Sequence, residues 1–222
     1  LNARNQPLKV LSVGCPVNTE TQEGIAILSE YLAGFLTVPR LKVLALRVLA
    51  VDSMIKEKDF KKTFLFLKEQ HNVADDQAFT ITTRVYRGGG FTKDYLYLKG
   101  LHHILNAYET NPDFINLLCG KVSLDYLPII SRLIEKNYLV KPKLITPSIA
   151  APSENDAIRQ FIAHAIKWQN IHNLKSKQPS IDGFSCPYHI IILTIDTANL
   201  YTKMSSTMWY VLLISFWYIK TR

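Results

Sequence analysis

Apolar side chains recur at helical spacing along most of this chain. Around residues 21–36 they occupy most of a helix circumference, which is typical of a buried helix. Thr19 and Gln22 fit a capping box at its start. By the same periodicity, helices are predicted over about 40–56, 60–71, 75–87, 93–108, 112–118, 124–136 and 153–174. These segments predict a mostly α-helical protein, although the Thr and Val content of 75–87 would equally suit a strand.

Prolines and glycines interrupt this pattern at intervals. Residues 1–18 look irregular, and 139–152 holds three prolines, which predicts a linker or an extended arm. From these breaks we expect a helical domain over 1–145, then a linker and amphipathic helix over 146–179. An apolar tail of unknown role follows over 180–222.

Composition narrows the class of protein. The 222 residues are 48% hydrophobic, which is enough for a folded core. The net charge of +8 comes from scattered lysines and arginines with acids between them, so we expect no nucleic-acid partner. The three cysteines form no C-x-x-C pair, which predicts reduced thiols. With no signal-like opening, a cytoplasmic location is expected.

The tail contains an uncharged run of 16 residues, 204–219. As a helix it would span roughly 24 Å, which is short of a hydrocarbon core of roughly 30 Å. Trp209 and Trp217 near its ends resemble an interfacial belt. We therefore favour an apolar appendage over a membrane anchor. A non-enzymatic, membrane-associated interaction module is the alternative to an enzyme.

Two patterns of residues are candidates for chemistry. Glu23 lies in an apolar helix, where an ionised carboxylate needs compensation by a metal such as zinc, by a cation or by helix amides. A first-turn Glu that complements the helix dipole is the simpler interpretation. No H-E-x-x-H motif accompanies it.

The second pattern is RVYRGGGFTKDYLY. Its cations Arg84, Arg87 and Lys93 flank three glycines that lead into a helix N-terminus, an arrangement suited to a phosphate or a carboxylate. Lys93 and Tyr97 share a helix face and could act as an electrostatic clamp and a proton donor. The same sequence pattern would result from a helix that ends at the glycines and whose arginines interact favourably with the C-terminal end of the helix dipole.

Three segments carry a resemblance to a known family: LNARNQPLKVLSVGCP, TQEGIAILSEYLAG and RVYRGGGFTKDYLYLKGL. They resemble the family named for its Gln-Glu-Gly motif, whose bacterial members are labelled flavohemoglobin expression-modulating QEGLC-motif proteins. Its animal relatives include the microtubule-associated tyrosine carboxypeptidases. The likeness covers about residues 1–145.

The resemblance implies the C-terminal part of a carboxypeptidase-like zinc metallopeptidase. It implies that Glu23 is a zinc ligand, that Arg84, Arg87 and Lys93 bind the substrate and that Tyr97 supports the oxyanion. The substrate would be a peptide or protein C-terminus. The bacterial-type motifs are closer, so the resemblance does not extend to tubulin.

The chain also departs from the family pattern. The family's H-E-x-x-x-H helix, which supplies two His ligands and a Glu base, precedes the Gln-Glu-Gly motif by some tens of residues. Here only 22 residues precede Glu23, and none is His. We therefore expect a fragment that begins just after that helix, binds zinc weakly and is inactive alone.

Overall fold

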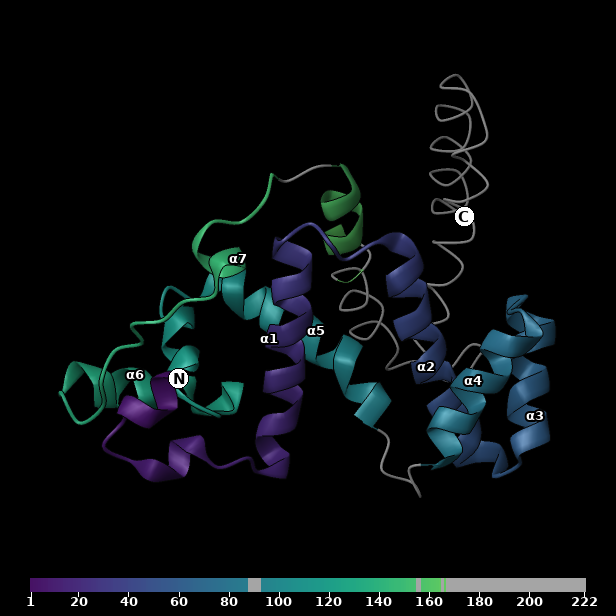
Figure 1. Cartoon of the computed structure of the whole chain (residues 1–222), viewed down its shortest axis with the longest axis horizontal. Coiled ribbons are helices and arrows are strands. Elements are labelled where there is room, and N and C mark those ends of the chain that lie inside the picture. The colour runs from purple at the N-terminus through teal and green to yellow at the C-terminus, as the bar shows by residue number, and fades with distance from the viewer. Residues whose placement is uncertain (88–92, 155–156, 165, 167–222) are drawn as a thin grey trace, which may run out of the picture.

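A computed structural model describes residues 1–87, 93–154, 157–164 and 166, and the structural findings concern these residues. The mostly α-helical fold predicted from the sequence is confirmed, since the described part consists of α-helices and short helical turns without any strand (Figure 1). No helix within it combines the length and the apolar character that crossing a bilayer requires. The apolar run 204–219 lies outside the described residues.

Helices α1 (Thr19–Leu32) and α5 (Lys93–Thr110) cross at the centre of the fold and make the most extensive helix–helix contact. Two glycines allow the close approach. A Cβ placed on Gly24 would lie 2.5 Å from the carbonyl oxygen of Gly100, and a Cβ on Gly100 would collide with the carbonyl oxygen of Glu20. The crossing fixes where the α1 carboxylates stand relative to α5.

Helix α2 (Val38–Glu57) packs against both α5 and α4 (Asp75–Arg87). Pro39 lies in its first turn, as predicted. Between α2 and α4 come α3 (Phe60–Leu65) and a π-helical turn, η4 (Phe66–Gln70). Asp59 caps α3 by accepting a hydrogen bond of 3.0 Å from the Lys62 amide, again as predicted. Segment 75–87 is a helix and not a strand.

The N-terminal segment forms three 3-10 turns: η1 (Asn2–Asn5), η2 (Lys9–Ser12) and η3 (Pro16–Asn18). It lies beside η5 (Phe114–Cys119), η6 (Leu124–Tyr126) and α6 (Leu127–Glu135) (Figure 1). A small core joins these elements and contains Leu11, Cys119, Val122, Ile130 and Leu139.

Residues 139–146, called the arm below, run back along this N-terminal segment without regular structure. Two side-chain amides hold the arm by its backbone. Gln6 donates to the Val140 carbonyl (2.8 Å) and accepts from the Val140 amide (2.9 Å). Asn2 donates to the Leu144 carbonyl (2.6 Å) and accepts from its amide (3.0 Å). Each side-chain amide thereby satisfies one backbone N–H and one backbone C=O of the arm, as a neighbouring strand would in a sheet.

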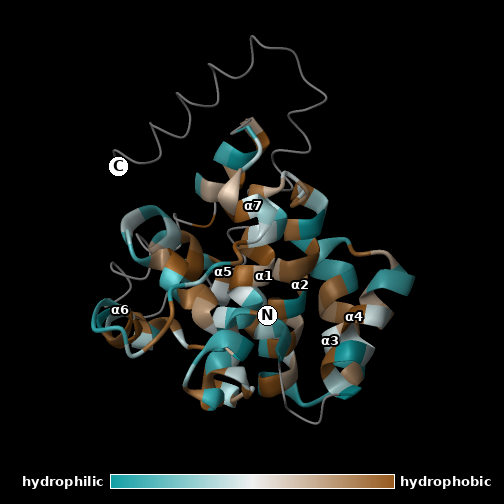
Figure 2. Ribbon diagram, turned by 60° about the vertical axis from the view of Figure 1, so that its left-hand side comes forward, coloured by the Kyte–Doolittle hydropathy of each residue, from teal (hydrophilic) through white to brown (hydrophobic). Residues whose placement is uncertain are grey.

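The main core lies where α1, α2 and α5 meet, and the hydrophobic colouring of Figure 2 gathers there. Described residues beyond the arm join it: Ile149 of α7 (Pro147–Ala150), and Ile162 and Ile166 from the helical segment after residue 156. Ser153 ties this part of the chain to α1, because its amide and hydroxyl both donate to the Leu32 carbonyl at 2.9 Å. The division at residue 145 remains a prediction.

The predicted start and end of α1 were wrong. Its N-cap is Asn18 in right-handed helical geometry, with no capping hydrogen bond from a side chain, because η3 leads directly into the helix. Thr19 is already helical, so the capping box does not form. The helix stops at Leu32 because Gly34 adopts the left-handed conformation (φ 78°). Glu23 consequently lies in the second turn, and Glu20 is the first-turn acid.

Two other predicted helices also differ in the structure. The short helix expected over 112–118 is the 3-10 helix η5, and Ser123 precedes a 3-10 turn, η6, before α6 begins. Ser123 caps neither element with its side chain, since its hydroxyl donates to the Asp125 carboxylate at 3.2 Å. Gly88–Gly90 and the end of the helix predicted over 153–174 lie outside the described residues.

Candidate anion-binding site

The predicted site residues lie on three helices. Arg84 and Arg87 occupy the last turn of α4, Lys93 and Tyr97 the first turns of α5, and Glu23 the facing side of α1. The close crossing at Gly24 determines this arrangement, because Glu23 directly precedes that glycine. Residues far apart in the sequence thus meet at the N-terminal end of α5.

Lys93 and Glu23 form an ion pair. The Nζ atom of Lys93 lies 2.5 Å from Oε1 of Glu23, and the two side chains are 54% and 20% exposed. The hydrogen bond from Lys93 to Glu23 raises the pKa of Lys93 above its usual value, with burial opposing the shift. In the described structure, a lysine ammonium therefore compensates the carboxylate predicted to bind zinc.

Arg84 is oriented by a buried carboxylate that the sequence did not single out. Its Nε donates to both carboxylate oxygens of Asp94, at 2.8 and 2.9 Å, and the Asp94 side chain is only 9% exposed. This hydrogen bond raises the pKa of Arg84 above its usual value, with burial opposing and Tyr97 contributing. Arg84 is 38% exposed, so part of its guanidinium remains open to solvent.

Arg47 of α2 approaches the same carboxylate from another direction. Its Nη1 lies 3.8 Å from Oδ1 of Asp94, and its side chain is 19% exposed. Burial lowers the pKa of Arg47, as does the positive charge of Arg84, while Asp94 opposes the shift. Its Nε atom has no hydrogen-bond partner among the described residues. The sequence signal was an arginine inside the apolar run LKVLALRVLAV, where a charge needs a partner.

Tyr97 and Arg87, the two remaining residues predicted for the site, differ in their contacts. The Lys93 ammonium lies 5.9 Å from the centre of the Tyr97 ring, and the ring is half-buried against the core. Arg87 is exposed, and its side chain makes no hydrogen bond or ion pair within the part of the chain that the structure describes. Among the described residues, nothing therefore competes with a ligand for its guanidinium.

The site has an excess of positive charge. Arg47, Arg84 and Lys93, together called the cationic cluster, face two carboxylates, Glu23 and Asp94. Arg87 lies in the last turn of α4 with Arg84. An anion is the ligand that such an excess attracts, and a carboxylate suits the planar guanidinium of arginine in particular. The cluster is thus a candidate anion-binding site on a helical fold.

A zinc site needs several metal-binding side chains close together. Within the described ranges, no group of three or more His, Cys, Asp or Glu side chains lies close enough together to hold a metal ion. His103 lies with its Nδ1 2.7 Å from Oε1 of Glu20, but Lys99 is the other partner of that carboxylate. The described residues do not form a zinc site on their own, because three protein ligands are normally needed.

Comparison with protein families agrees with the resemblance in the sequence. A family model described as microtubule-associated tyrosine carboxypeptidase matches residues 1–167, and the chain belongs to this family. The match includes the cationic cluster and all five residues predicted for the site. Comparison with curated proteins and with solved structures gave no match.

Proposed function

We propose that the chain binds the C-terminal carboxylate of a peptide or protein in a carboxypeptidase reaction. The observation that carries this proposal is the cationic cluster around Asp94 and Glu23. Arg87 lies in the last turn of α4 with Arg84 and is unpaired among the described residues. A carboxylate is the group that distinguishes a chain terminus from the rest of a peptide, and the family description names a carboxypeptidase. Recognition of that group is the first requirement of the reaction.

Each side chain has a separate role in the proposal. Arg87 is exposed and makes no ion pair among the described residues, so it would make the first contact with the incoming carboxylate. Arg84 offers its remaining N–H groups while Asp94 keeps the guanidinium in place, which makes Asp94 and Arg47 positioning residues. Tyr97 has a hydroxyl that can donate to an oxygen of the substrate.

Lys93 must exchange partners when the substrate binds. In the described structure its ammonium contacts Glu23, and the same ammonium would contact the substrate carboxylate in the complex. The Lys93 end of this pair is exposed, and surface ion pairs contribute about 1 kcal/mol or less, so the exchange costs little. The assignments of Glu23 to zinc and of Tyr97 to the oxyanion stay predictions, and binding of the carboxylate depends on neither.

A binding measurement on the full chain tests the proposal. The probe is a short peptide that ends in tyrosine and carries a fluorescent label on its N-terminus, followed by anisotropy. The free acid should bind about tenfold more tightly than the C-terminal amide, because the amide has no charge to offer the cluster. Lys93→Met and Arg87→Met should each reduce this preference.

Lys61→Met is the matched control, since it removes one exposed positive charge from α3. It should leave the preference for the acid unchanged. Equal affinity for the acid and the amide, or an equal loss in the control, would contradict the proposal.

A further inference from the structure

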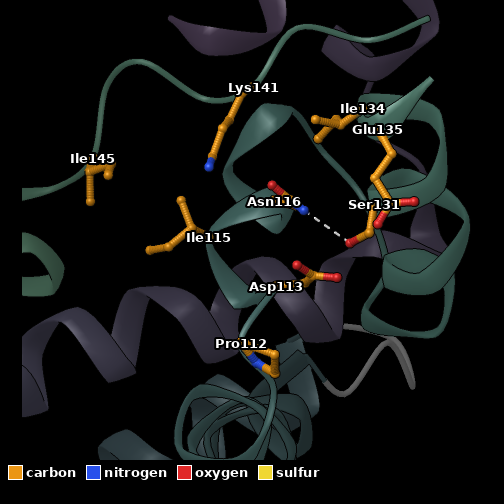
Figure 3. A pocket seen from close by; sticks show the side chains of 9 residues that line it. All are labelled: Pro112, Asp113, Ile115, Asn116, Ser131, Ile134, Glu135, Lys141 and Ile145. Carbon is orange, nitrogen blue, oxygen red and sulfur yellow. Dashed lines mark hydrogen bonds between the residues drawn. The ribbon is translucent and has the colours of Figure 1, made fainter. Parts of the chain in front are cut away.

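A pocket of about 370 Å³ lies beyond the opposite end of α5 from the cationic cluster (Figure 3). Helix α6 and the turn η5 form two of its walls, and the arm forms a third. Its lining consists of Pro112, Asp113, Ile115, Asn116, Ser131, Ile134, Glu135, Lys141 and Ile145. The volume falls in the range of small-molecule sites.

Three charged side chains converge on this pocket without neutralising one another. Asp113, Glu135 and Lys141 are exposed, and none of their charged ends makes a hydrogen bond or an ion pair within the described residues. Figure 3 shows the Lys141 ammonium on one side of Asn116 and both carboxylates on the other. The pocket thus has a cationic end and an anionic end.

A neutral amide lies between the two ends. Asn116 is 8% exposed, and its Nδ2 donates to the hydroxyl of Ser131, also buried, at 3.0 Å. This bond fixes the orientation of the amide and leaves the second N–H and Oδ1 free of protein partners in the described structure. One free donor and one free acceptor are the complement of a peptide group.

Apolar side chains complete the wall. Ile115 projects from η5, Ile134 from α6 and Ile145 from the arm, so that three elements each supply an isoleucine. These branched side chains suit an aliphatic or aromatic group of a ligand, while the polar groups fix its direction.

We propose that this pocket binds a dipeptide zwitterion with an apolar side chain. Its ammonium would contact Asp113 and Glu135, its peptide group Asn116, and its carboxylate Lys141. An extended dipeptide carries its ammonium and its carboxylate about 7 Å apart, and the pocket likewise presents its lysine and its acidic side chains as separate groups. A single amino acid carries both charges on one carbon and has no peptide group. This inference does not rest on the proposed function.

The test uses the full chain labelled at isoleucine methyl groups and titrated with alanyl-leucine. Saturable shifts are expected at Ile115, Ile134 and Ile145. N-acetylation and C-terminal amidation of the dipeptide should each weaken binding about fivefold or more, because each removes one charged end. Free leucine should bind more weakly than the dipeptide by a similar factor.

Lys141→Met should abolish the discrimination between the dipeptide and its amide. Lys143→Met, two residues along the arm and outside the pocket lining, is the control and should retain it. Lys93→Met should also retain it, which separates this pocket from the cationic cluster. Failure of alanyl-leucine to shift these methyl groups, or binding equally tight for free leucine, would overturn the proposal.

Discussion

The ammonium of Lys93 lies 2.5 Å from the carboxylate of Glu23, although 69 residues separate them in the chain. One helix supplies the anion and another the cation, and their glycine-mediated crossing brings the two together. The residue predicted to bind a metal and a residue predicted to bind the substrate are thus direct partners. Any ligand of either group has to compete with the other.

Zinc binding should be weak in this chain. Glu23 is paired with Lys93, and the described residues provide no group of three ligands. Titration calorimetry with zinc should show no stoichiometric binding in the submicromolar range. Glu30→Gln is the control for a variant at Glu23, because Glu30 lies on the same helix as Glu23 and pairs with Arg40 of α2. Tight binding that is lost in Glu23→Gln but kept in Glu30→Gln would show that ligands outside the described residues join Glu23.

Asp94→Asn should destabilise the fold and weaken carboxylate binding. The substitution leaves the positive charges of Arg84 and Arg47 without their shared carboxylate. Because Arg84 is partly exposed, the expected loss in free energy of unfolding is about 2 kcal/mol, measured in urea. Asp52→Asn removes the exposed pair with Lys56 and should cost no more than about 0.5 kcal/mol. Equal losses in the two variants would show that Asp94 has no special role.

Gly24→Ala should destabilise the fold, although alanine has a higher helix propensity than glycine. Propensity alone favours Ala over Gly by about 1 kcal/mol, but the added methyl group would meet the Gly100 backbone at 2.5 Å. Overpacking of this kind costs about 1–3 kcal/mol, measured in urea. Ala26→Gly, at an exposed position of the same helix, reports the propensity alone and should cost about 1 kcal/mol. A stabilising Gly24→Ala would disprove the close crossing.

Glu20 should make stability depend on pH in the acid range. Burial raises the pKa of Glu20, but hydrogen bonds from Lys99 and His103 outweigh burial, so its pKa is lower than the usual 4.5. The folded state then binds fewer protons than the unfolded state. The stabilisation is present above pH 4.5 and is lost as pH falls through the folded-state pKa.

Urea unfolding at pH 7 and at about pH 3.5 measures this contribution. In Glu20→Gln the loss of stability between the two pH values should be smaller than in the parent chain. Lys99→Met, which removes the 2.8 Å partner of Glu20, should reduce the loss in the same direction. An unchanged loss in both variants would assign the acid sensitivity to other carboxyl groups.

Local signals in the sequence predicted the helices well. The bounds of α4 were predicted as residues 75–87, since two aspartates open it and glycines follow it. The first-turn Pro39 and the cap Asp59 were also recognised, because both act through neighbouring residues. The capping box predicted at Thr19 was wrong, because the 3-10 turn η3 runs directly into α1 and the N-cap position falls on Asn18. Its side chain donates to the Lys121 carbonyl at 2.6 Å, a partner that no local pattern contains.

The candidate site likewise contains residues that a local motif identifies and residues that only the folded structure brings together. Arg84, Arg87, Lys93 and Tyr97 stand in one continuous motif, so the sequence could group them. Arg47 and Asp94 were missed because their importance arises from packing: the two residues meet only after α2 and α5 are placed side by side. The ion pair between Glu23 and Lys93 depends on the helix crossing in the same way.

The manner in which Asn2 and Gln6 hold the arm has a consequence for how this protein can change. Both amides bind main-chain atoms of Val140 and Leu144 and make no hydrogen bond to their side chains. The exposed positions of the arm can therefore change their side chains while these hydrogen bonds are kept, whereas the buried Leu139 and the two N-terminal amides are constrained. Lys141 and Ile145 belong to that variable segment. Replacing them offers a route to a pocket of different ligand preference on an unchanged scaffold.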